Sequence, residues 1–372
     1  MKKVLFFVIT LTLLGCNKAV KTPEQNYQVQ EIEINNDNEE LPSELVDSIS
    51  FVALKENSQS YFTAISKMEI VGDRIFIFDK LGSNTLLEFN KDGDFVRSYG
   101  EHGHGSSEFL RLWDFDIDSE FVYLYDRQRQ KMLWFDHNGQ YVKSITTDYI
   151  GDGFKKIDNG SYLFSLAKGA KVAKGDNDPK LCIVDSDLKV KTIMQHFGSN
   201  ETDDKVTDNL FHNAGKDIVY HKPLSDSVFV VSNDGKVQSC FIIDFKSERI
   251  PTDMMGSYEK LIENGGKKKY SYMYDCPLIA KNTMICPIFH KGNKATLIID
   301  TSTHKSHITD WVDGVRLADI IMPVYSCDDY VVGWLDQEVF GAISDKQLVT
   351  PEMVKHLDNG GKILVYYHLR KR

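Results

Sequence analysis

The sequence predicts an all-β protein, a six-bladed β-propeller in which a strand from the N-terminal part closes the last blade. The first observation is a repeat with a period of about 46 residues, which suits a four-stranded antiparallel sheet repeated around an axis. The runs 72–79 and 87–98 return, nearly unchanged in pattern, as 119–126 and 133–144. The second observation is an alternating run, 46–54, that has no hairpin partner near it in the chain.

The size and charge of the chain limit what it can bind. It has 372 residues and a formal net charge of −10 at pH 7. Length alone would suggest two or three domains, but one array of repeats is one domain whatever its length. An acidic chain repels phosphate backbones, and no basic stripe with interleaved aromatic residues occurs. We therefore expect no nucleic-acid partner.

The first residues have the features of a targeting segment. Two lysines precede an apolar run, 4–14, that is too short to span a bilayer, and a Leu-Leu-Gly-Cys sequence ends at Cys16. This sequence resembles a bacterial lipobox; the alternative is an ordinary signal peptide. The resemblance implies that residues 1–15 are removed and that Cys16 is lipidated, and Asn17 implies transit to the outer membrane. Several acyl chains on one cysteine anchor a protein stably.

The segment 16–45 is rich in Asn, Gln and acidic residues and poor in apolar ones, which predicts a flexible tether between lipid and domain. The propeller is expected over 46–372. Its first strand, 46–54, should pair with the C-terminal strand, 363–369, because joining the two ends completes the last blade and removes exposed sheet edges.

The remaining strands divide into six units in chain order. Blades are expected at about 65–99, 109–145, 154–190, 227–244, 277–300 and from 320 to the C-terminal strand. The turns at Gly93 and Gly139 place glycine where antiparallel strands need a left-handed backbone. The period fails at about 252–266, where helical spacing followed by two glycines predicts a short inserted helix. Seven blades are the alternative.

At this point the sequence resembles a family. The run 73–79, the turn around Gly93, the loop 100–105 and the Glu108-Phe109 pair are similar to NHL-type repeats. From end to end, the chain resembles the six-bladed β-propeller lipoproteins abundant in Bacteroidetes, most of which have no assigned biochemical role. The resemblance implies a fold and an anchor, but no catalytic residues.

Five cysteines follow Cys16, and an odd number spread through a large domain is not a disulfide framework. No pair has the CxxC spacing of a structural zinc site. A three-residue hairpin loop centred on Lys281 would place Cys276 and Cys286 opposite each other on adjacent strands. A disulfide between them is therefore one reading; two buried single thiols are the other.

Candidate ligand-facing residues come from a glycine-rich loop and from the predicted inner strands. His102 and His104 could point the same way, but two imidazoles make only half a metal site, and a crossover between blades also explains the glycines. The channel mouth is the default ligand site of a propeller. The side chains expected near it are Arg111, Asp114, His212, Tyr220 and His221. These groups could instead satisfy one another.

The sequence contains no HExxH, GxSxG or GxxxxGK[ST] motif. We therefore expect a binding or interaction module of the cell envelope, without cofactor or metal. Its ligand, an envelope protein, a small molecule or a glycan, should bind at the channel mouth. The alternative is an NHL-like envelope enzyme, a metal-dependent lyase or lactonase with its site in the central channel. A purely structural role is a third hypothesis.

Overall fold

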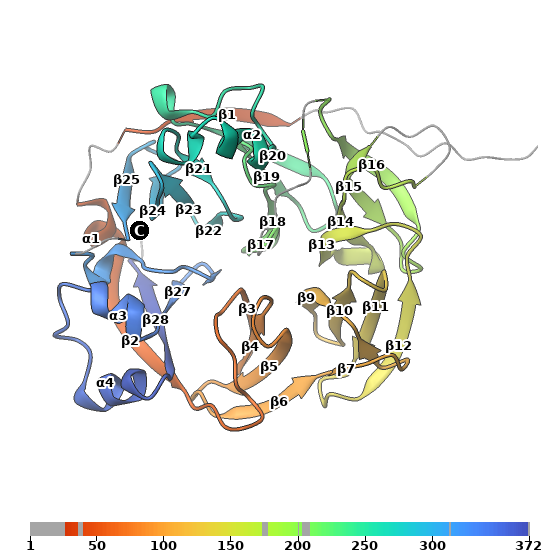
Figure 1. Ribbon diagram of the computed structural model, residues 1–372, viewed down its shortest axis with the longest axis horizontal. Coiled ribbons are helices and arrows are strands. Elements are labelled where there is room, and N and C mark those ends of the chain that lie inside the picture. Colours follow the sequence, from red (N-terminus) through yellow and green to blue (C-terminus); the bar gives the residue numbers. More distant parts are fainter. Residues whose placement is uncertain are drawn as a thin grey trace, which may run out of the picture.

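The computed structural model describes residues 27–35, 40–172, 178–199, 201–202, 209–311 and 314–370. Six sheets stand around a central axis (Figure 1), so the protein is a six-bladed β-propeller, as predicted. The first three sheets have four strands each. Blade one contains β3 (Lys67–Val71), β4 (Arg74–Asp79), β5 (Thr85–Asn90) and β6 (Phe95–Tyr99); blade two contains β9 (Leu112–Ile117), β10 (Val122–Asp126), β11 (Lys131–Phe135) and β12 (Tyr141–Thr146); blade three contains β13 (Gly151–Lys156), β14 (Tyr162–Leu166), β15 (Pro179–Val184) and β16 (Val190–His196).

The other three blades follow the same plan with additions. Blade four contains β17 (Phe211–Ala214), β18 (Asp217–Tyr220), β19 (Ser227–Val231) and β20 (Val237–Asp244); blade five contains β21 (Tyr272–Met273), β22 (Leu278–Ala280), β23 (Thr283–His290), β24 (Asn293–Asp300) and β25 (Ser306–Asp310); blade six contains β26 (Tyr325–Ser326), β27 (Tyr330–Leu335), β28 (Lys362–Leu369) and β2 (Val46–Leu54). The strands β7 (Glu101–His102) and β8 (Glu108–Phe109) form a small separate pair.

The closure of the ring is confirmed. Strand β2 pairs antiparallel with β28 from Val46 opposite Leu369 to Leu54 opposite Lys362. The two ends of the propeller domain therefore share one sheet, and β2 covers the edge of β28 that would otherwise be unpaired.

The tether expected at 16–45 is corrected in its second half. Strand β1 (Gln28–Glu33) lies parallel to β20 and adds a fifth strand to blade four, and helix α1 (Leu41–Leu45) packs before β2. Ile32 and Ile34, two residues apart, both enter the hydrophobic core, which is what fixes this face of the strand. The expected signal peptide, 1–15, and Cys16 lie outside the described residues.

The helices lie in the connections. They are α2 (Tyr258–Glu263), α3 (Gln337–Ala342), α4 (Pro351–Asp358) and four single turns, η1 (Asp158–Gly160), η2 (Lys246–Glu248), η3 (Gly266–Lys268) and η4 (Leu317–Asp319). Helix α2 lies within the insertion expected at about 252–266, and the Ser257 side chain caps it by accepting the Lys260 N–H. Helices α3 and α4 between β27 and β28 were not predicted. No helix in the described part is long and apolar enough to cross a membrane.

The repeated aspartates explain why the period is visible in the sequence. Asp79 and Asp126 end the second strand of blades one and two, and both are fully buried. The Asp79 carboxylate accepts the backbone N–H groups of Thr63, Gly82 and Ser83 at 2.8–2.9 Å. The Asp126 carboxylate accepts those of Leu110, Arg111 and Arg129 at 2.7–3.3 Å. Each aspartate therefore ties the incoming crossover to the turn of its own blade.

Candidate functional site

Charged side chains from the inner strands fill the centre of the ring. Lys67 of β3 donates to Asp114 of β9, with 2.8 Å between Nζ and Oδ1, and to the Phe115 carbonyl at 2.6 Å. The second oxygen of Asp114 accepts the Phe154 N–H of β13 at 2.9 Å. This layer links the first three blades across the axis.

A second layer lies two residues further along the same strands. Lys155 of β13 donates to Glu69 at 2.8 Å and to Asp116 at 2.6 Å, and Asn213 of β17 donates to Glu69 at 3.0 Å. Burial disfavours the ammonium group, but the two carboxylates outweigh that effect and raise the pKa of Lys155 above its ordinary value. The layer is therefore a fixed ion network that spans four blades.

Three of the predicted ligand-facing residues belong to the interior instead. His212 is buried beside the network, and burial together with the Lys67 and Lys155 charges lowers its pKa to about 3. The Tyr220 hydroxyl lies 3.3 Å from Ser165 Oγ, and His221 Nδ1 lies 3.0 Å from the Ser227 carbonyl oxygen. Burial lowers the pKa of His221 to about 4. Tyr220 and His221 are at most 1% exposed, so the expectation that they face a ligand is corrected.

The glycine-rich loop holds its histidines apart from the channel network. His102 is exposed, contacts the Phe109 ring with 4.7 Å between centroids, and lies 3.4 Å from the Ser83 carbonyl oxygen. His104 is also exposed. The glycines make room for Glu108, whose carboxylate accepts the Gly105 N–H at 2.7 Å and would collide with a Cβ at Gly103. The glycines are therefore explained by the crossover between blades one and two.

The last two predicted residues, Arg111 and Asp114, also contact other parts of the protein. Arg111 is half-buried and donates to the Lys80 carbonyl oxygen at 3.4 Å, and Asp114 lies in the network. In the described part of the chain, no group of three or more His, Cys, Asp or Glu side chains could hold a metal ion.

The proposed disulfide is absent. Cys276 and Cys286 are both buried free thiols, and burial raises the pKa of each. Ala280 pairs with Thr283, so the hairpin loop has two residues, Lys281 and Asn282, rather than three. That register places residue 277 opposite Cys286, and the two cysteines are offset by one residue.

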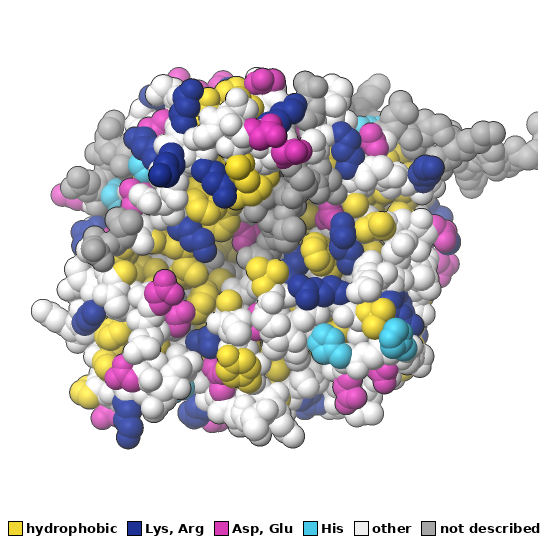
Figure 2. All heavy atoms as spheres, viewed as in Figure 1, with side chains coloured by type: hydrophobic (Ala, Val, Ile, Leu, Met, Phe, Trp, Pro, Cys, Tyr) yellow, Lys and Arg dark blue, Asp and Glu magenta, His cyan; other side chains and the backbone are white. Residues whose placement is uncertain are grey.

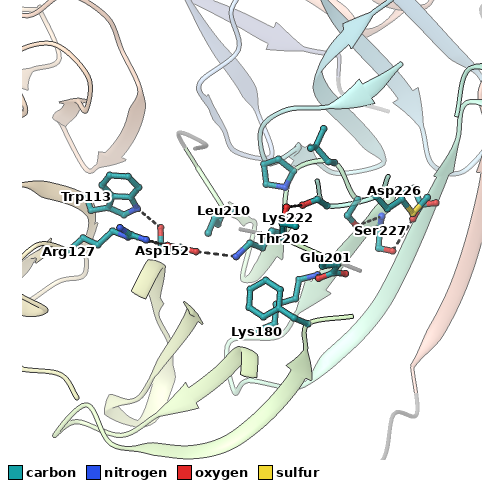
Figure 3. Close-up of a pocket in the computed structure, with 16 residues that line it drawn as sticks. Trp113, Arg127, Asp152, Lys180, Glu201, Thr202, Leu210, Lys222, Asp226 and Ser227 are labelled. Carbon is teal, nitrogen blue, oxygen red and sulfur yellow. Dashed lines mark hydrogen bonds and ion pairs between the residues drawn. The ribbon is translucent and has the colours of Figure 1, made fainter. Parts of the chain in front are cut away.

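A cavity of about 320 Å³ lies at one mouth of the channel, between blades two, three and four (Figure 3). Trp113 of β9, Asp152 of β13 and Leu210, which precedes β17, form its side towards the axis. The rest of the lining is Arg127, Lys180, Phe197, Glu201, Thr202, Lys222, Pro223, Leu224, Ser225, Asp226, Ser227, Met255 and Gly256.

Asp152 joins the three blades at this cavity. One oxygen of its carboxylate accepts Nε and Nη2 of Arg127 at 3.2 and 3.1 Å, and the other accepts Nζ of Lys222 at 3.1 Å. Its backbone carbonyl accepts the Trp113 indole N–H at 3.0 Å. The polar wall is therefore held in one geometry before any ligand arrives.

Ammonium and guanidinium groups cover the two aromatic rings. Lys222 Nζ lies 4.5 Å and Lys180 Nζ 5.7 Å from the centre of the Phe197 ring. Lys180 also pairs with Glu201, 2.9 Å between Nζ and Oε2. Arg127 lies 4.7 Å from the Trp113 ring. None of these lining residues was predicted, because they come from three blades and share no motif; the one signal was Trp113, between the predicted Arg111 and Asp114.

A second cavity of about 610 Å³ lies at the other end of the channel. Asp116, Lys155 and Asn213 of the second network layer are among the residues that line it. The second layer of the ion network therefore forms part of the wall of this cavity.

Residues 27–359 match the family model of a domain of unknown function, DUF4934. The chain belongs to this family. Among solved structures, a protein of Bacteroides fragilis described as exported is similar over 92% of this chain and 100% of its own, with a TM-score of 0.73 and 15% identity. A DUF4221 family member from Bacteroides vulgatus is similar over 88% and 98%, with a TM-score of 0.50 and 10% identity.

A virginiamycin B lyase from Staphylococcus aureus is similar over 71% of this chain and 74% of its own, with a TM-score of 0.41 and 15% identity. A likeness that weak carries no argument about activity. No curated protein matches the sequence. The comparisons therefore establish a propeller of a family without an assigned function, similar in fold to a protein described as exported.

Proposed function

We propose that this protein is a binding module of the cell envelope, anchored by lipid at Cys16 to the outer membrane, which holds its ligand in the cavity between blades two, three and four. The observation that carries the proposal is the cavity itself. Side chains from three blades converge on one concave site of about 320 Å³, within the size range of ligand pockets.

The chemistry of the lining favours binding over catalysis. Its described residues include no histidine and no cysteine, the side chains that most often act as bases and nucleophiles. The hydroxyl groups are engaged locally: Ser225 Oγ accepts the Ser227 N–H at 3.0 Å, and Ser227 Oγ donates to Asp226. Polar groups held rigidly beside apolar side chains, here Leu210, Leu224 and Met255, fix the orientation of a ligand.

The envelope location has two supports. The N-terminal segment has the pattern of a lipoprotein signal, and the similar Bacteroides fragilis protein is described as exported. The ligand is then a molecule of that compartment, a small molecule, a glycan end or an exposed group of an envelope protein.

A cavity-filling variant tests the proposal. Met255 lines the cavity, and Met255→Trp should fill part of it without touching the Asp152 ion pairs. Ile262→Trp is the matched control, because Ile262 is 48% exposed on α2 and lies outside the cavity. The probes are a panel of sugars, amino acids and organic acids, and their binding is measured by ligand-observed NMR.

We expect at least one member of the panel to bind the wild type and the Ile262→Trp variant, and to lose at least ~10-fold in affinity for Met255→Trp because its space is occupied. Equal binding to all three proteins would place the ligand elsewhere and overturn the proposal. The absence of any binding to the wild type would also count against it.

A further inference from the structure

Every charged side chain that lines the cavity between blades two, three and four has a partner of opposite charge within the protein. The pairs are Arg127–Asp152 at 3.1 Å, Lys222–Asp152 at 3.1 Å, Lys180–Glu201 at 2.9 Å and Arg249–Asp226. A ligand that enters the cavity therefore meets ion pairs rather than single charges.

The two lysines that contact the aromatic rings of the cavity are engaged as well. Lys80 Nζ lies 4.1 Å from the centre of the Trp113 ring. Lys168 Nζ donates to the Glu201 backbone carbonyl and lies 6.0 Å from the centre of the Phe197 ring. Both lysines have further interactions within the protein. In Figure 2, Lys and Arg side chains (dark blue) and Asp and Glu side chains (magenta) both lie near the centre of the ring, beside hydrophobic ones (yellow).

A charged ligand group would meet repulsion in this cavity whichever sign it carries. An anion placed at Arg127 would lie beside the Asp152 carboxylate, and a cation placed at Asp152 would lie beside Arg127 and Lys222. The side chains of Lys180, Asp152 and Lys222 are only 11%, 12% and 13% exposed, so little water reaches them. Low exposure strengthens the repulsion between like charges and leaves the lost hydration of the ligand's own charge without a replacement.

An uncharged group can be bound without breaking an ion pair. A guanidinium carries five N–H donors, and two of the Arg127 donors go to Asp152. The Arg127 side chain is 32% exposed at the cavity, so a carbonyl or hydroxyl oxygen of a ligand can accept from it as well. Leu210, Leu224 and Met255 supply apolar surface for the rest of the ligand.

We infer that the cavity binds an uncharged ligand portion of about one ring, a neutral sugar or a neutral amide, whose carbonyl or hydroxyl oxygen accepts a hydrogen bond from Arg127. Its apolar part lies against Leu210, Leu224 and Met255. The inference rests on the proposed function and specifies its ligand class. The paired charges hold the polar wall in place and exclude charged relatives of the same ligand.

Probes of similar shape and different charge test the inference. Benzamide is neutral, benzoate is an anion and benzamidine is a cation; glucose, glucuronate and glucosamine form a second such set. Each probe is titrated at pH 7 into the full folded protein and followed by ligand-observed NMR. In the set that binds, we expect the neutral member to bind at least ~10-fold more tightly than either charged member, because it needs no counter-ion. The set that binds also distinguishes an amide from a sugar.

Breaking one ion pair should change this selectivity. Asp152→Asn leaves Arg127 and Lys222 without their shared carboxylate, so the anion should gain at least ~10-fold in affinity relative to the neutral probe. Asp148→Asn is the matched control, because Asp148 belongs to an exposed pair with Lys189 outside the cavity lining and should leave the selectivity unchanged.

A second variant tests the opposite sign. Lys180→Met removes the cation that pairs with Glu201, so the cationic probe should gain relative to the neutral one, by at least ~3-fold because Glu201 is 29% exposed and partly screened by water. Lys189→Met is its control. Thermal unfolding shows which variants are folded, and if Asp152→Asn is not, Lys180→Met decides.

The outcomes separate the inference from the proposed function. A charged probe that binds the wild type as tightly as its neutral counterpart overturns the inference; if Met255→Trp weakens that probe, the binding site stands. Unchanged selectivity in the folded pair-breaking variants also overturns it. If none of the six probes binds the wild type, the inference fails, whereas the proposed function fails only if the wider panel shows no binding either.

Discussion

Replacing Lys155 with methionine should destabilise the propeller more than any replacement of a surface lysine. Lys155 is 4% exposed and bridges Glu69 and Asp116, so the variant leaves two buried carboxylates without their shared cation. Each carboxylate keeps one neutral partner, the Asn213 amide for Glu69 and the Lys156 N–H for Asp116. Breaking a buried ion pair by removing one partner costs about 3–5 kcal/mol, and we expect a loss in that range.

The loss is measured by urea unfolding at pH 7, followed by tryptophan fluorescence. Lys189→Met is the control: both partners of the Lys189–Asp148 pair are more than half exposed, so it should change stability by less than about 1 kcal/mol. The triple variant Lys155→Met, Glu69→Gln, Asp116→Asn removes the unpaired charges and should recover part of the loss. A loss below about 1 kcal/mol in Lys155→Met would refute the cross-channel network.

Three further predictions follow from other parts of the chain. Burial lowers the pKa of His212 to about 3 and of His221 to about 4, below the ordinary 6.5. The unfolded chain therefore binds more protons, and stability should fall as pH drops from 6.5 towards 4, by up to ~1.4 kcal/mol per pH unit for each histidine. Urea unfolding of the wild type and of the double variant His212→Gln/His221→Gln at pH 7 and pH 5 checks this, and an equal change of stability with pH in both proteins would contradict it. Gly93→Ala should cost at least ~2 kcal/mol more than Gly160→Ala, because both have positive φ but only the Gly93 Cβ would meet a backbone atom, the Ala53 oxygen at 2.1 Å; similar unfolding midpoints would disprove it. The Cys16→Ser variant should be lost from the membrane fraction, whereas the control variant Cys327→Ser should remain in it. Mass spectrometry of the mature wild-type protein checks the cleavage, and a protein that still begins at Met1 would rule out the anchor.

The repeat was readable because its residues act locally. Asp79 and Asp126 accept hydrogen bonds from the turns of their own blades. Because both blades need the same contact, the same residue stands at the equivalent position of each repeat. Gly93 and Gly139 both have φ near +80°, as the turns require. The closing strand was identified differently: the run 46–54 alternates between apolar and polar residues, which indicates a strand even though its partner β28 lies more than 300 residues later.

Other features depend on partners far away in the chain. Strand β1 pairs with β20, about 200 residues later, and its polar exposed face looks like a tether when it is read alone. The cysteine pair failed through a single residue of loop length, which reverses the facing of a strand.

The candidate site illustrates the same limit. Asp114 was predicted to face a ligand, but its carboxylate is buried in the ion network. Tyr220, at the end of β18, and His221, which follows it, are buried as well. The cavity is built by Arg127, Asp152 and Lys222, which are brought together only when three blades stand side by side. The conspicuous histidines of the loop 100–105 have no comparable convergence.

The most direct test of the binding account is the structure of crystals soaked with the probe that binds most tightly in the NMR panel. The account predicts density for the probe in the cavity between blades two, three and four, in contact with the residues that line it. Density only in the opposite cavity, the one lined by Asp116 and Asn213, would contradict it.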